Sequence, residues 1–412
     1  MLRLSVNSLG VFVNDKWMIA MTAGTWQLDG IKKAKALGFK VLGIDASEAA
    51  PGLTICDEFL VVDIFDKELL LDSIKKVNIT PIGVVSYCSE SGMMPAAWIR
   101  EEFNLTGPDS KSTAKLLYKH EQRKIWQDRG VEELKWILTS SLDEAVSALS
   151  VIGLPLIVKP VDSSGSRGVS KVIIKEEFEN AFNRAKQPSK SGMVLLEEFI
   201  EGVEYTVEAF TANSVTKILA VTEKAKVEGS RGTVALELAY PSVAPEVIER
   251  IKNKVLDAVK ALDYQAGPSH TEVILTKTGR IGIVEMAGRG GGFGVFSMLV
   301  PLASGVDIGE LLIRQVMGED IDLDKSKVEQ NIFSLKFFPS TKNGTISGIS
   351  GFEEMNKISG VAVGSYVSIG QEVYSDFLDG NRLGYMLVKA ETLNKVRELL
   401  REIERTVSFE TS

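Results

Sequence analysis

Two segments that lie far apart in the chain constrain it more than any other feature. The first is Val158-Lys159-Pro160, which leads into the serine- and glycine-rich residues 163–168; the second joins His270-Thr271-Glu272 to Glu285 and Arg289. A lysine beside a glycine-rich loop offers a cation and backbone N–H groups that suit nucleotide phosphates. Two carboxylates and a guanidinium suit magnesium and a phosphoryl group in transfer. Together the two segments predict an enzyme that uses ATP.

Composition agrees with this prediction and argues against several other classes. The chain has 412 residues, 44% of them hydrophobic and 25% charged, and such a length predicts about three domains. A formal net charge of −8 argues against a nucleic-acid partner or an anionic membrane surface. The two cysteines, Cys56 and Cys88, provide neither a disulfide framework nor a thiolate zinc site.

The N-terminal apolar stretch does not have the pattern of a signal peptide or of a membrane span. It is interrupted at Asn14, Asp15 and Lys16, whereas a spanning helix needs about 20 consecutive apolar residues. We therefore expect a cytoplasmic protein without a membrane partner, and leave a homodimer open.

Residues 1–108 alternate strand and helix signals. Gly24 ends the first apolar run and Asp45 closes the second, where a dinucleotide-binding domain places its ribose acid. The glycine fingerprint of such a domain is missing, because Trp26 and Gln27 stand where a pyrophosphate needs close backbone approach. We therefore expect a parallel, Rossmann-like sheet that helps to build a substrate cleft. Its expected strands cover 17–22, 41–44, 59–62 and 83–86, and its expected helices cover 28–37 and 67–76.

A lysine-rich segment follows. Its polar, lysine-rich composition predicts a helix over 110–129. A second helix is predicted over 139–149, with Ser140 or Ser141 as its N-terminal cap.

Lys159 ends a strand over 156–159, and the loop 163–168 separates it from a strand over 169–174. This loop lacks the Gly-Lys-Ser/Thr ending of a Walker loop and no helix start follows it, so we expect a lid. A lysine that is only solvated is the alternative interpretation.

Residues 194–208 predict a strand, a short connector with one glycine, and a second strand. Such a connector can present backbone N–H and C=O groups to an adenine edge, while a carboxylate after it reaches ribose hydroxyls. A charged hairpin with solvated acids is the alternative.

The order of these elements resembles the ATP-grasp superfamily of carboxylate–amine or carboxylate–thiol ligases, and most of all its L-amino-acid ligase branch. The resemblance covers nearly the whole chain and implies an α/β ATP-grasp fold. The implied parts are a Rossmann-like pre-ATP-grasp domain over 1–108, linking helices and a lid subdomain over 109–193, an α+β grasp domain over 194–330 and an α+β C-terminal cap over 331–412. The cap agrees with strand signals over 332–338, 361–369 and 383–388, an Asn343-Gly344 turn, and a charged amphipathic helix over 392–404.

The resemblance also implies roles for single residues. ATP would be held by Lys119, Lys159, the loop residues Ser163, Ser164, Gly165, Ser166 and Gly168, the adenine connector Glu197, Glu198, Phe199 and Ile200, the ribose acid Glu204, and Lys224. Magnesium, with manganese as an alternative, would be held by Glu272 and Glu285. Catalysis would use Arg289 and His270, and the substrate would meet Arg231, Arg289, Gly291 and Gly292.

One position departs from the pattern of many grasp enzymes. Ala287 stands where they carry an asparagine ligand, so phosphates, water or a bidentate Glu285 must complete the coordination of the metal.

The implied reaction activates a carboxylate as an acyl phosphate and transfers it to an amine, with amino acids as the expected substrates. His270 is either the base for the amine or a structural partner of Glu272. A carboxylation-type or carboxylate–thiol ligase and a non-catalytic nucleotide-binding protein are the alternatives.

Overall fold

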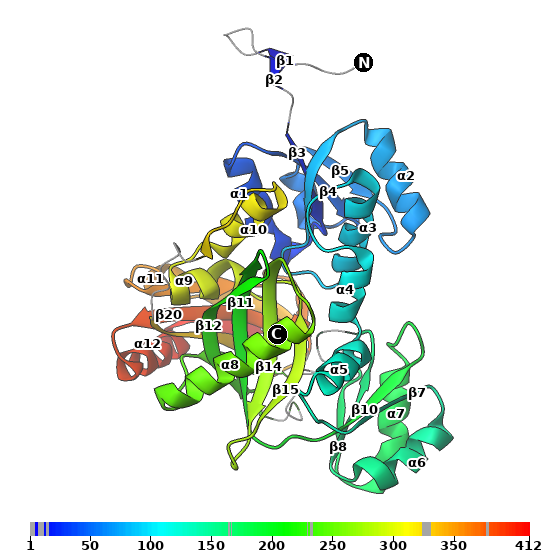
Figure 1. The fold of residues 1–412 in the computed structure, drawn as a ribbon. Coiled ribbons are helices and arrows are strands. Elements are labelled where there is room, and N and C mark those ends of the chain that lie inside the picture. The colour runs from blue at the N-terminus through cyan, green and yellow to red at the C-terminus, as the bar shows by residue number, and fades with distance from the viewer. Residues whose placement is uncertain are drawn as a thin grey trace.

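The computed structural model describes residues 5–6, 12–13, 16–163, 165, 167–228, 230, 234–323, 331–375 and 379–412. Figure 1 shows a parallel-sheet unit (blue to cyan) above a large sheet, with a smaller subdomain around β8 and β10 beside α5. The cleft between the smaller subdomain and the large sheet carries most of the residues that the sequence singles out.

The N-terminal unit is a parallel sheet of order β5-β4-β3-β6, as the alternating pattern predicts. Ile19, Leu42 and Val84 are fully buried at its centre, because strands covered on both faces are apolar throughout. Its strands are β3 (Trp17–Met21), β4 (Lys40–Asp45), β5 (Glu58–Val61) and β6 (Pro81–Val85), and its helices are α1 (Leu28–Ala36), α2 (Lys67–Val77) and α3 (Met93–Phe103).

The single helix predicted over 110–129 is wrong, because the structure has two helices there. α4 (Ser110–Leu117) ends where Tyr118 is extended, with φ −94° and ψ 112°, and α5 (Lys119–Asp128) starts at the next residue. The Lys119 amide donates to Val161 O at 3.4 Å, so a hydrogen bond to the lid stabilises the break between the two helices. The break places Lys119 at the head of a helix that faces the cleft.

The lid subdomain is a four-stranded sheet of order β7-β10-β8-β9, with two helices packed on it. Thr139 ends a strand and does not start a helix, which corrects the predicted helix limit; the helix begins at Leu142 and Ser141 caps it. The elements are β7 (Trp136–Thr139), α6 (Leu142–Ile152), β8 (Leu156–Pro160), β9 (Ser170–Val172), α7 (Phe178–Lys186) and β10 (Val194–Glu198).

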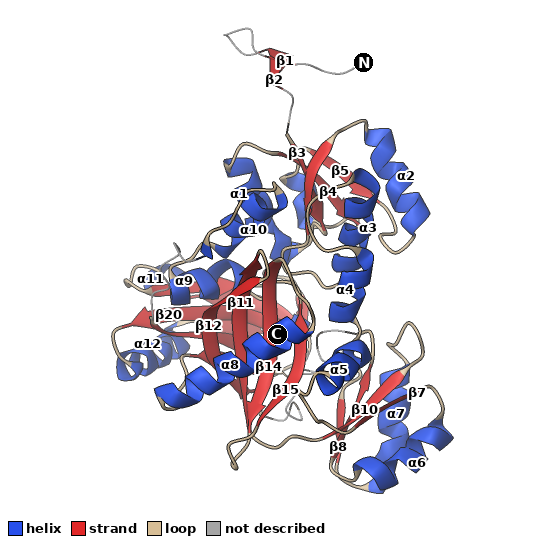
Figure 2. Cartoon of the chain, in the orientation of Figure 1, coloured by secondary structure: helices blue, strands red, loops and turns tan. Residues whose placement is uncertain are grey.

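The large sheet is antiparallel and has the order β15-β14-β11-β12-β13-β16-β20-β18. Along β11 side chains alternate between faces: Tyr205 and Val207 pack on α8, whereas Glu204 and Thr206 face the cleft. Figure 2 shows α8 lying across this sheet. The elements are β11 (Val203–Ala212), β12 (Val215–Lys226), β13 (Ala235–Ala239), α8 (Pro245–Ala261), β14 (Gly267–Leu275), β15 (Ile281–Ala287), α9 (Val300–Ser304) and α10 (Ile308–Val316).

The C-terminal residues continue this sheet, because β16 pairs directly with β13. α12 buries Val396, Leu399 and Ile403 against the added strands. The elements are β16 (Ile332–Pro339), β17 (Gly344–Ser350), β18 (Val361–Ser365), β19 (Glu372–Val373), β20 (Arg382–Ala390), α12 (Leu393–Thr406) and β21 (Ser408–Thr411). The domain limits at 108, 193 and 330 stay a proposal, and β10 pairs within the lid sheet although it follows residue 193.

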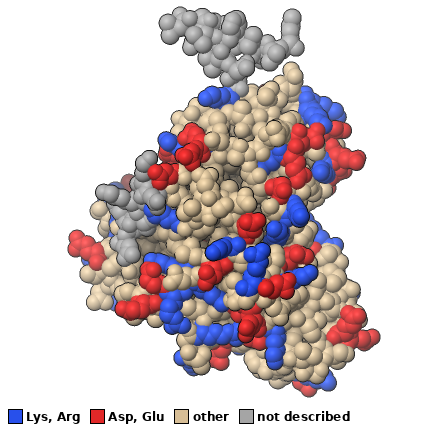
Figure 3. All heavy atoms as spheres, viewed as in Figure 1, with Lys and Arg blue, Asp and Glu red and all other residues tan. Residues whose placement is uncertain are grey.

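No single described helix is long and apolar enough to cross a membrane; one bent pair, Val295–Ser304 with Ile308–Val316, passes that test by length and composition only. Acidic and basic side chains are interspersed over the face shown in Figure 3.

Candidate active site

A cavity of about 270 Å³ lies between the lid sheet and the large sheet. It is lined by most of the residues expected to bind nucleotide and metal: Lys119, Lys159, Ser163, Gly165, Glu197, Glu198, Phe199, Ile200, Glu204, Lys224, Glu272 and Glu285. Strands, loops and the start of α5 supply these side chains from both halves of the cleft, so the fold gathers residues that are distant in sequence.

Two buried lysines enter this cavity from the lid side. Lys119 Nζ donates to Ser163 O at 3.0 Å and lies 3.2 Å from Glu285 Oε2. Burial opposes the charge on Lys119, but Glu285 and Glu90 outweigh it and raise the pKa of this lysine. Lys159 differs, because burial lowers its pKa although Glu197 lies 2.8 Å from its Nζ. Both lysines line the cavity, and each is paired with a carboxylate there.

Glu197 forms ion pairs with two cations, Arg123 and Lys159, at the edge of the cleft. Its carboxylate is 4% exposed and pairs with Arg123 at 2.6 Å and Lys159 at 2.8 Å. Burial works against its charge, but these two cations lower the pKa of Glu197 to about 2. Its side chain therefore orients Lys159, which leaves only the backbone of this connector residue for an adenine edge.

The rest of the connector is braced by the lid. Glu198 N donates to Lys135 O at 3.0 Å and Phe199 N donates to Pro155 O at 3.2 Å. The carboxylate of Glu198 forms an ion pair with Arg280 at 2.9 Å. Lys171 lies 3.6 Å above the centre of the Phe199 ring, so the connector has a fixed position next to the cavity.

Lys224 joins the expected ribose acid to an expected metal ligand. Its Nζ donates to Glu204 Oε1 at 2.5 Å and to Glu272 Oε1 at 2.9 Å. Burial opposes its charge, but the two carboxylates outweigh burial and raise its pKa. Lys226 adds a second cation 2.5 Å from Glu204 Oε2. The two sites are thus coupled through one ammonium group.

Glu272 and Glu285 form a pair of carboxylates on neighbouring strands, with an irregularity in the register directly after Glu272. Nearby cations lower the pKa of both groups against the effect of burial: Lys224 and His270 act on Glu272, and Lys119 acts on Glu285. Magnesium in phosphate-transferring sites is typically held by one or two carboxylates plus phosphate oxygens and water. In the described part of the chain no group of three or more His, Cys, Asp and Glu residues could hold a metal, so this pair fits that ion only together with a nucleotide.

His270 is enclosed by carboxylates. Its Nδ1 hydrogen-bonds to Glu208, and its Nε2 lies 3.6 Å from Glu272 Oε1. Burial opposes its protonation, but Glu208 outweighs burial and raises the pKa of His270 to about 9. Both ring nitrogens of His270 therefore face carboxylates. This geometry favours a role for His270 in positioning Glu272 and argues against a role as the general base.

A second cavity of about 260 Å³ meets the first one and is lined by His270, Arg289 and Gly292. Arg289 Nη2 donates to Glu90 Oε2 at 3.2 Å, and its Nη1 donates to Gly290 O at 2.9 Å. The two cavities share Gly165, Lys224, Glu272 and Glu285. The carboxylate pair therefore lies at the junction of the two cavities.

Some predicted residues lie elsewhere. Gly168, with φ +76°, packs against Pro160 and Pro188, and Gly291 packs against Val295; neither lines the cavities. Ser164, Ser166 and Arg231 lie outside the described residues.

Several lining residues were missed by the sequence analysis. They are Arg123, Lys171 and Lys226 in the first cavity and Trp26, Cys88, Glu90, Asp379 and Arg382 in the second. Trp26 and Glu90 follow the carboxyl ends of β3 and β6, the edge where open parallel sheets bind ligands, so this rule could have found them. The sequence around Asp379 and Arg382 contains no motif that would predict a binding site.

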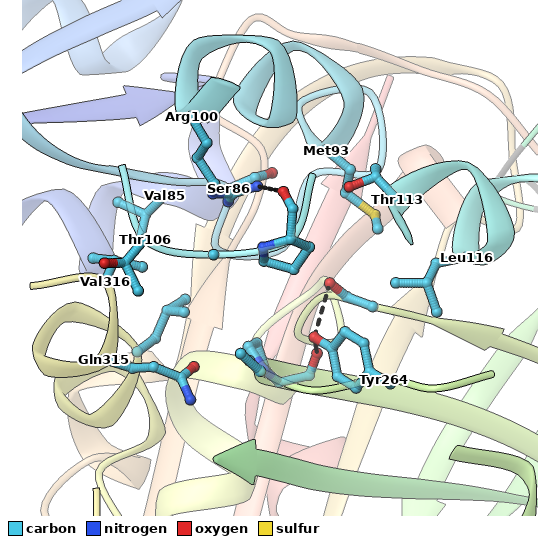
Figure 4. A pocket seen from close by; sticks show the side chains of 17 residues that line it. Val85, Ser86, Met93, Arg100, Thr106, Thr113, Leu116, Tyr264, Gln315 and Val316 are labelled. Atoms are coloured by element: carbon cyan, nitrogen blue, oxygen red, sulfur yellow. Dashed lines mark hydrogen bonds between the residues drawn. The ribbon is translucent and has the colours of Figure 1, made fainter. Parts of the chain in front are cut away.

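A small cavity of about 50 Å³ between the N-terminal unit and the large sheet shares no residue with these two (Figure 4). There Arg100 donates to Pro108 O at 3.1 Å and the Tyr264 hydroxyl donates to Pro268 O at 2.8 Å.

Known protein families match two parts of the chain. An ATP-grasp domain matches residues 152–296, and L-amino acid ligase C-terminal domain 2 matches residues 336–412. Alanine–anticapsin ligase of Bacillus subtilis is 25% identical over 289 residues, which are 64% of this chain and 60% of that protein.

Solved structures share the fold. An L-amino acid ligase from Bacillus licheniformis superposes with a TM-score of 0.82 at 20% identity, covering 97% of this chain and 100% of its own. The biotin carboxylase domain of the Hydrogenobacter thermophilus 2-oxoglutarate carboxylase, solved with MgADP, gives a TM-score of 0.77 at 20% identity, covering 97% and 92%. The chain therefore carries an ATP-grasp domain and a C-terminal domain of the L-amino acid ligase type, and the relatives that it resembles are ATP-grasp carboxylate–amine ligases.

Proposed function

We propose that this ligase activates the carboxylate of an amino acid with ATP and joins it to the amine of a second amino acid. The observation that carries the proposal is the junction of the two cavities at Glu272 and Glu285. A phosphoryl group placed there faces the nucleotide on one side and the substrate on the other, as phosphoryl transfer between them requires.

The first cavity supplies the nucleotide contacts. We assign the phosphates to Lys119 and Lys159, the adenine edge to the backbone of residues 197–200, and the ribose to Glu204. Glu272 and Glu285 would hold magnesium, which would supply charge neutralisation at the phosphates. The cations Lys119, Lys159 and Lys224 surround the same point and would stabilise charge that develops in transfer.

The substrate carboxylate attacks the γ-phosphorus of ATP, and ADP leaves with the electrons of the broken P–O bond. The product is an acyl phosphate. The amine then attacks the carbonyl carbon, inorganic phosphate leaves with the C–O bond electrons, and the amine loses one proton. Arg289 lines the second cavity beside Glu285 and is assigned to the charge on the acyl phosphate.

Water must be excluded from the acyl phosphate, because hydrolysis would return it to the free carboxylate before the amine reacts. Gly165 of the lid loop lines both cavities, so it lies at the point where they meet. We assign this loop the role of shielding the intermediate.

The test is ATP-dependent phosphate release by the purified protein with pooled amino acids, with pooled amino acids and an added thiol, and with bicarbonate alone, followed by mass spectrometry of the product. We expect phosphate release that requires amino acids and a product with an amide bond. Release with bicarbonate alone would assign the protein to the carboxylation type. Release that needs a thiol, with a thioester product, would assign it to the carboxylate–thiol type, and no release under any condition would contradict a catalytic role.

A further inference from the structure

Helix α5 lies between the edge strand of the large sheet and the lid subdomain (Figure 1). This edge strand is β15, and among the described strands it has a partner on one side only. Lys119, Gln122 and Arg123 occupy positions i, i+3 and i+4 of α5, which lie on one helical face. All three side chains are buried. This face of α5 therefore contacts both halves of the cleft that holds the first cavity.

Two of these side chains hold the backbone of β15 on either side of Glu285. Gln122 accepts a hydrogen bond from Met286 N at 3.1 Å and donates one to Met286 O at 2.6 Å. Arg123 Nη2 donates to Val284 O. Buried backbone groups at a sheet edge need partners, and here side chains take the place of a neighbouring strand. The proposed metal ligand therefore has a fixed place relative to α5.

Arg123 extends this connection to the lid. Its Nε donates to Glu197 Oε1 at 2.6 Å, and Lys159 Nζ lies 2.8 Å from the other oxygen, Glu197 Oε2. One guanidinium thus joins the carboxylate that orients Lys159 to the backbone next to Glu285. The Arg123 side chain is 2% exposed, and its guanidinium carbon lies 5.5 Å from the ring centre of Trp126, so packing leaves it little freedom.

We propose that Arg123 is a positioning residue, which fixes Lys159 of the lid relative to the strand that carries Glu285. The proposal rests on the proposed function, which assigns the phosphates to Lys159 and magnesium to Glu285. The two residues belong to different sheets, so their distance depends on what joins the sheets. A misplacement of about 1 Å costs on the order of a hundredfold in rate. Because Arg123 also lines the first cavity, direct contact with the nucleotide is the alternative.

The first test measures the binding of MgADP and of adenosine by calorimetry to the wild type, Arg123→Lys, Lys159→Met and the double variant. Arg123→Lys keeps the positive charge but loses the planar fork of donors. We expect it to weaken MgADP binding roughly tenfold, because Lys159 is then misplaced. Adenosine has no phosphate, so its Kd should stay within about twofold in all four proteins.

The double variant separates the two interpretations of Arg123. If Arg123 acts through Lys159, its replacement has no further effect once Lys159 is gone, and the double variant should bind MgADP like Lys159→Met within about twofold. Additive losses would overturn the positioning role, since they indicate a direct contact with the nucleotide. An equal loss of MgADP and adenosine binding in Arg123→Lys would also overturn it.

The second test measures phosphate release by the same four proteins with ATP and pooled amino acids. Arg123→Lys should lower kcat roughly 10- to 100-fold, and the double variant should again match Lys159→Met. A lower melting temperature with an unchanged kcat would mean that Arg123 only supports the fold. Arg280→Lys is the matched control, because Arg280 pairs with the neighbouring connector residue Glu198 at 2.9 Å and its side chain is 42% exposed. Its kcat should stay within about twofold of the wild type.

The outcomes distinguish this proposal from the proposed function. If the wild type releases phosphate and the losses are additive, the proposed function stands and the role of Arg123 fails. If the wild type releases no phosphate with any substrate, the proposed function fails, and the MgADP and adenosine affinities decide the role of Arg123. A wild type that binds MgADP no better than adenosine overturns both. If Arg123→Lys does not fold, Arg123→Gln, which keeps a donor for Val284 O, replaces it in both tests.

Discussion

Glu272 of β14 and Glu285 of β15 lie directly opposite each other as cross-strand partners. Two like charges in this arrangement destabilise a sheet unless cations compensate them. Lys224 and His270 contact Glu272, and Lys119 contacts Glu285, so each carboxylate has its own positive partner. The pair is held ionised at the point where the first and second cavities meet.

Replacing either carboxylate by its amide should therefore stop turnover while the protein stays folded. Loss of one metal ligand removes several kcal/mol of charge stabilisation, so we expect Glu272→Gln and Glu285→Gln to lower kcat at least about a thousandfold. Phosphate release and thermal melting measure the two effects, with the exposed Glu410→Gln as the control. Near-normal phosphate release by either folded variant would contradict the metal assignment.

Glu204→Ala should raise the KM for ATP much more than the KM for the carboxylate substrate. Its carboxylate pairs with Lys224 and Lys226, and Glu204 lines the first cavity but not the second. We expect an increase of roughly tenfold, which is what the loss of a charged hydrogen bond produces. Steady-state kinetics with each substrate varied in turn gives both constants. The reverse pattern would move the ribose site away from Glu204.

Gly165→Pro should reduce amide formation sharply without a comparable loss of stability. Gly165 has φ +64°, whereas proline requires about −65°, so the loop that carries it must change its path. No other atoms lie within 4 Å of an ideal Cβ at this position, so steric clash is not the cause of the effect. The measurement is the ratio of amide formed to ATP hydrolysed. A wild-type ratio in the variant would show that this residue does not shield the intermediate.

Glu197→Gln should weaken the protein in a pH-dependent manner. The folded pKa of about 2 lies below the usual value of 4.5, so the stabilisation from this carboxylate is fully present above about pH 4.5 and disappears as the pH falls toward 2. A shift of this size corresponds to on the order of 3 kcal/mol. The difference in free energy of unfolding between wild type and variant should shrink across that window. A difference that is constant from pH 7 to pH 3 would mean that Glu197 is not the titrating group.

The residues that sequence analysis found share one property: each belongs to a short motif whose chemistry can be read locally. Lys159 precedes a glycine-rich loop, and Glu272 and Glu285 stand on apolar strands with Arg289 following. Antiparallel pairing then brings Glu272 opposite Glu285, which the strand pattern allows but does not dictate.

The features that sequence analysis missed depend on tertiary contacts between segments that are distant in the sequence. Tyr118 interrupts a segment whose helix propensity is continuous, because the Lys119 amide bonds to Val161 O in the lid. Arg382 reaches the cleft only because β20 joins the grasp sheet through β16. Such long-range pairing leaves no trace in the residues around position 382.

The pairing of β13 with β16 places Glu237 opposite Lys336 and Leu238 opposite Leu335. A chain truncated before β16 would expose β13 as an unprotected edge, which is a template for aggregation. An exchange of the C-terminal region between relatives must therefore preserve the register of this seam, since a slip of one residue would turn every side chain of the transplanted strands to the wrong face. In this protein the C-terminal strands both complete the main sheet and line the second cavity, so the two features are inherited as one unit.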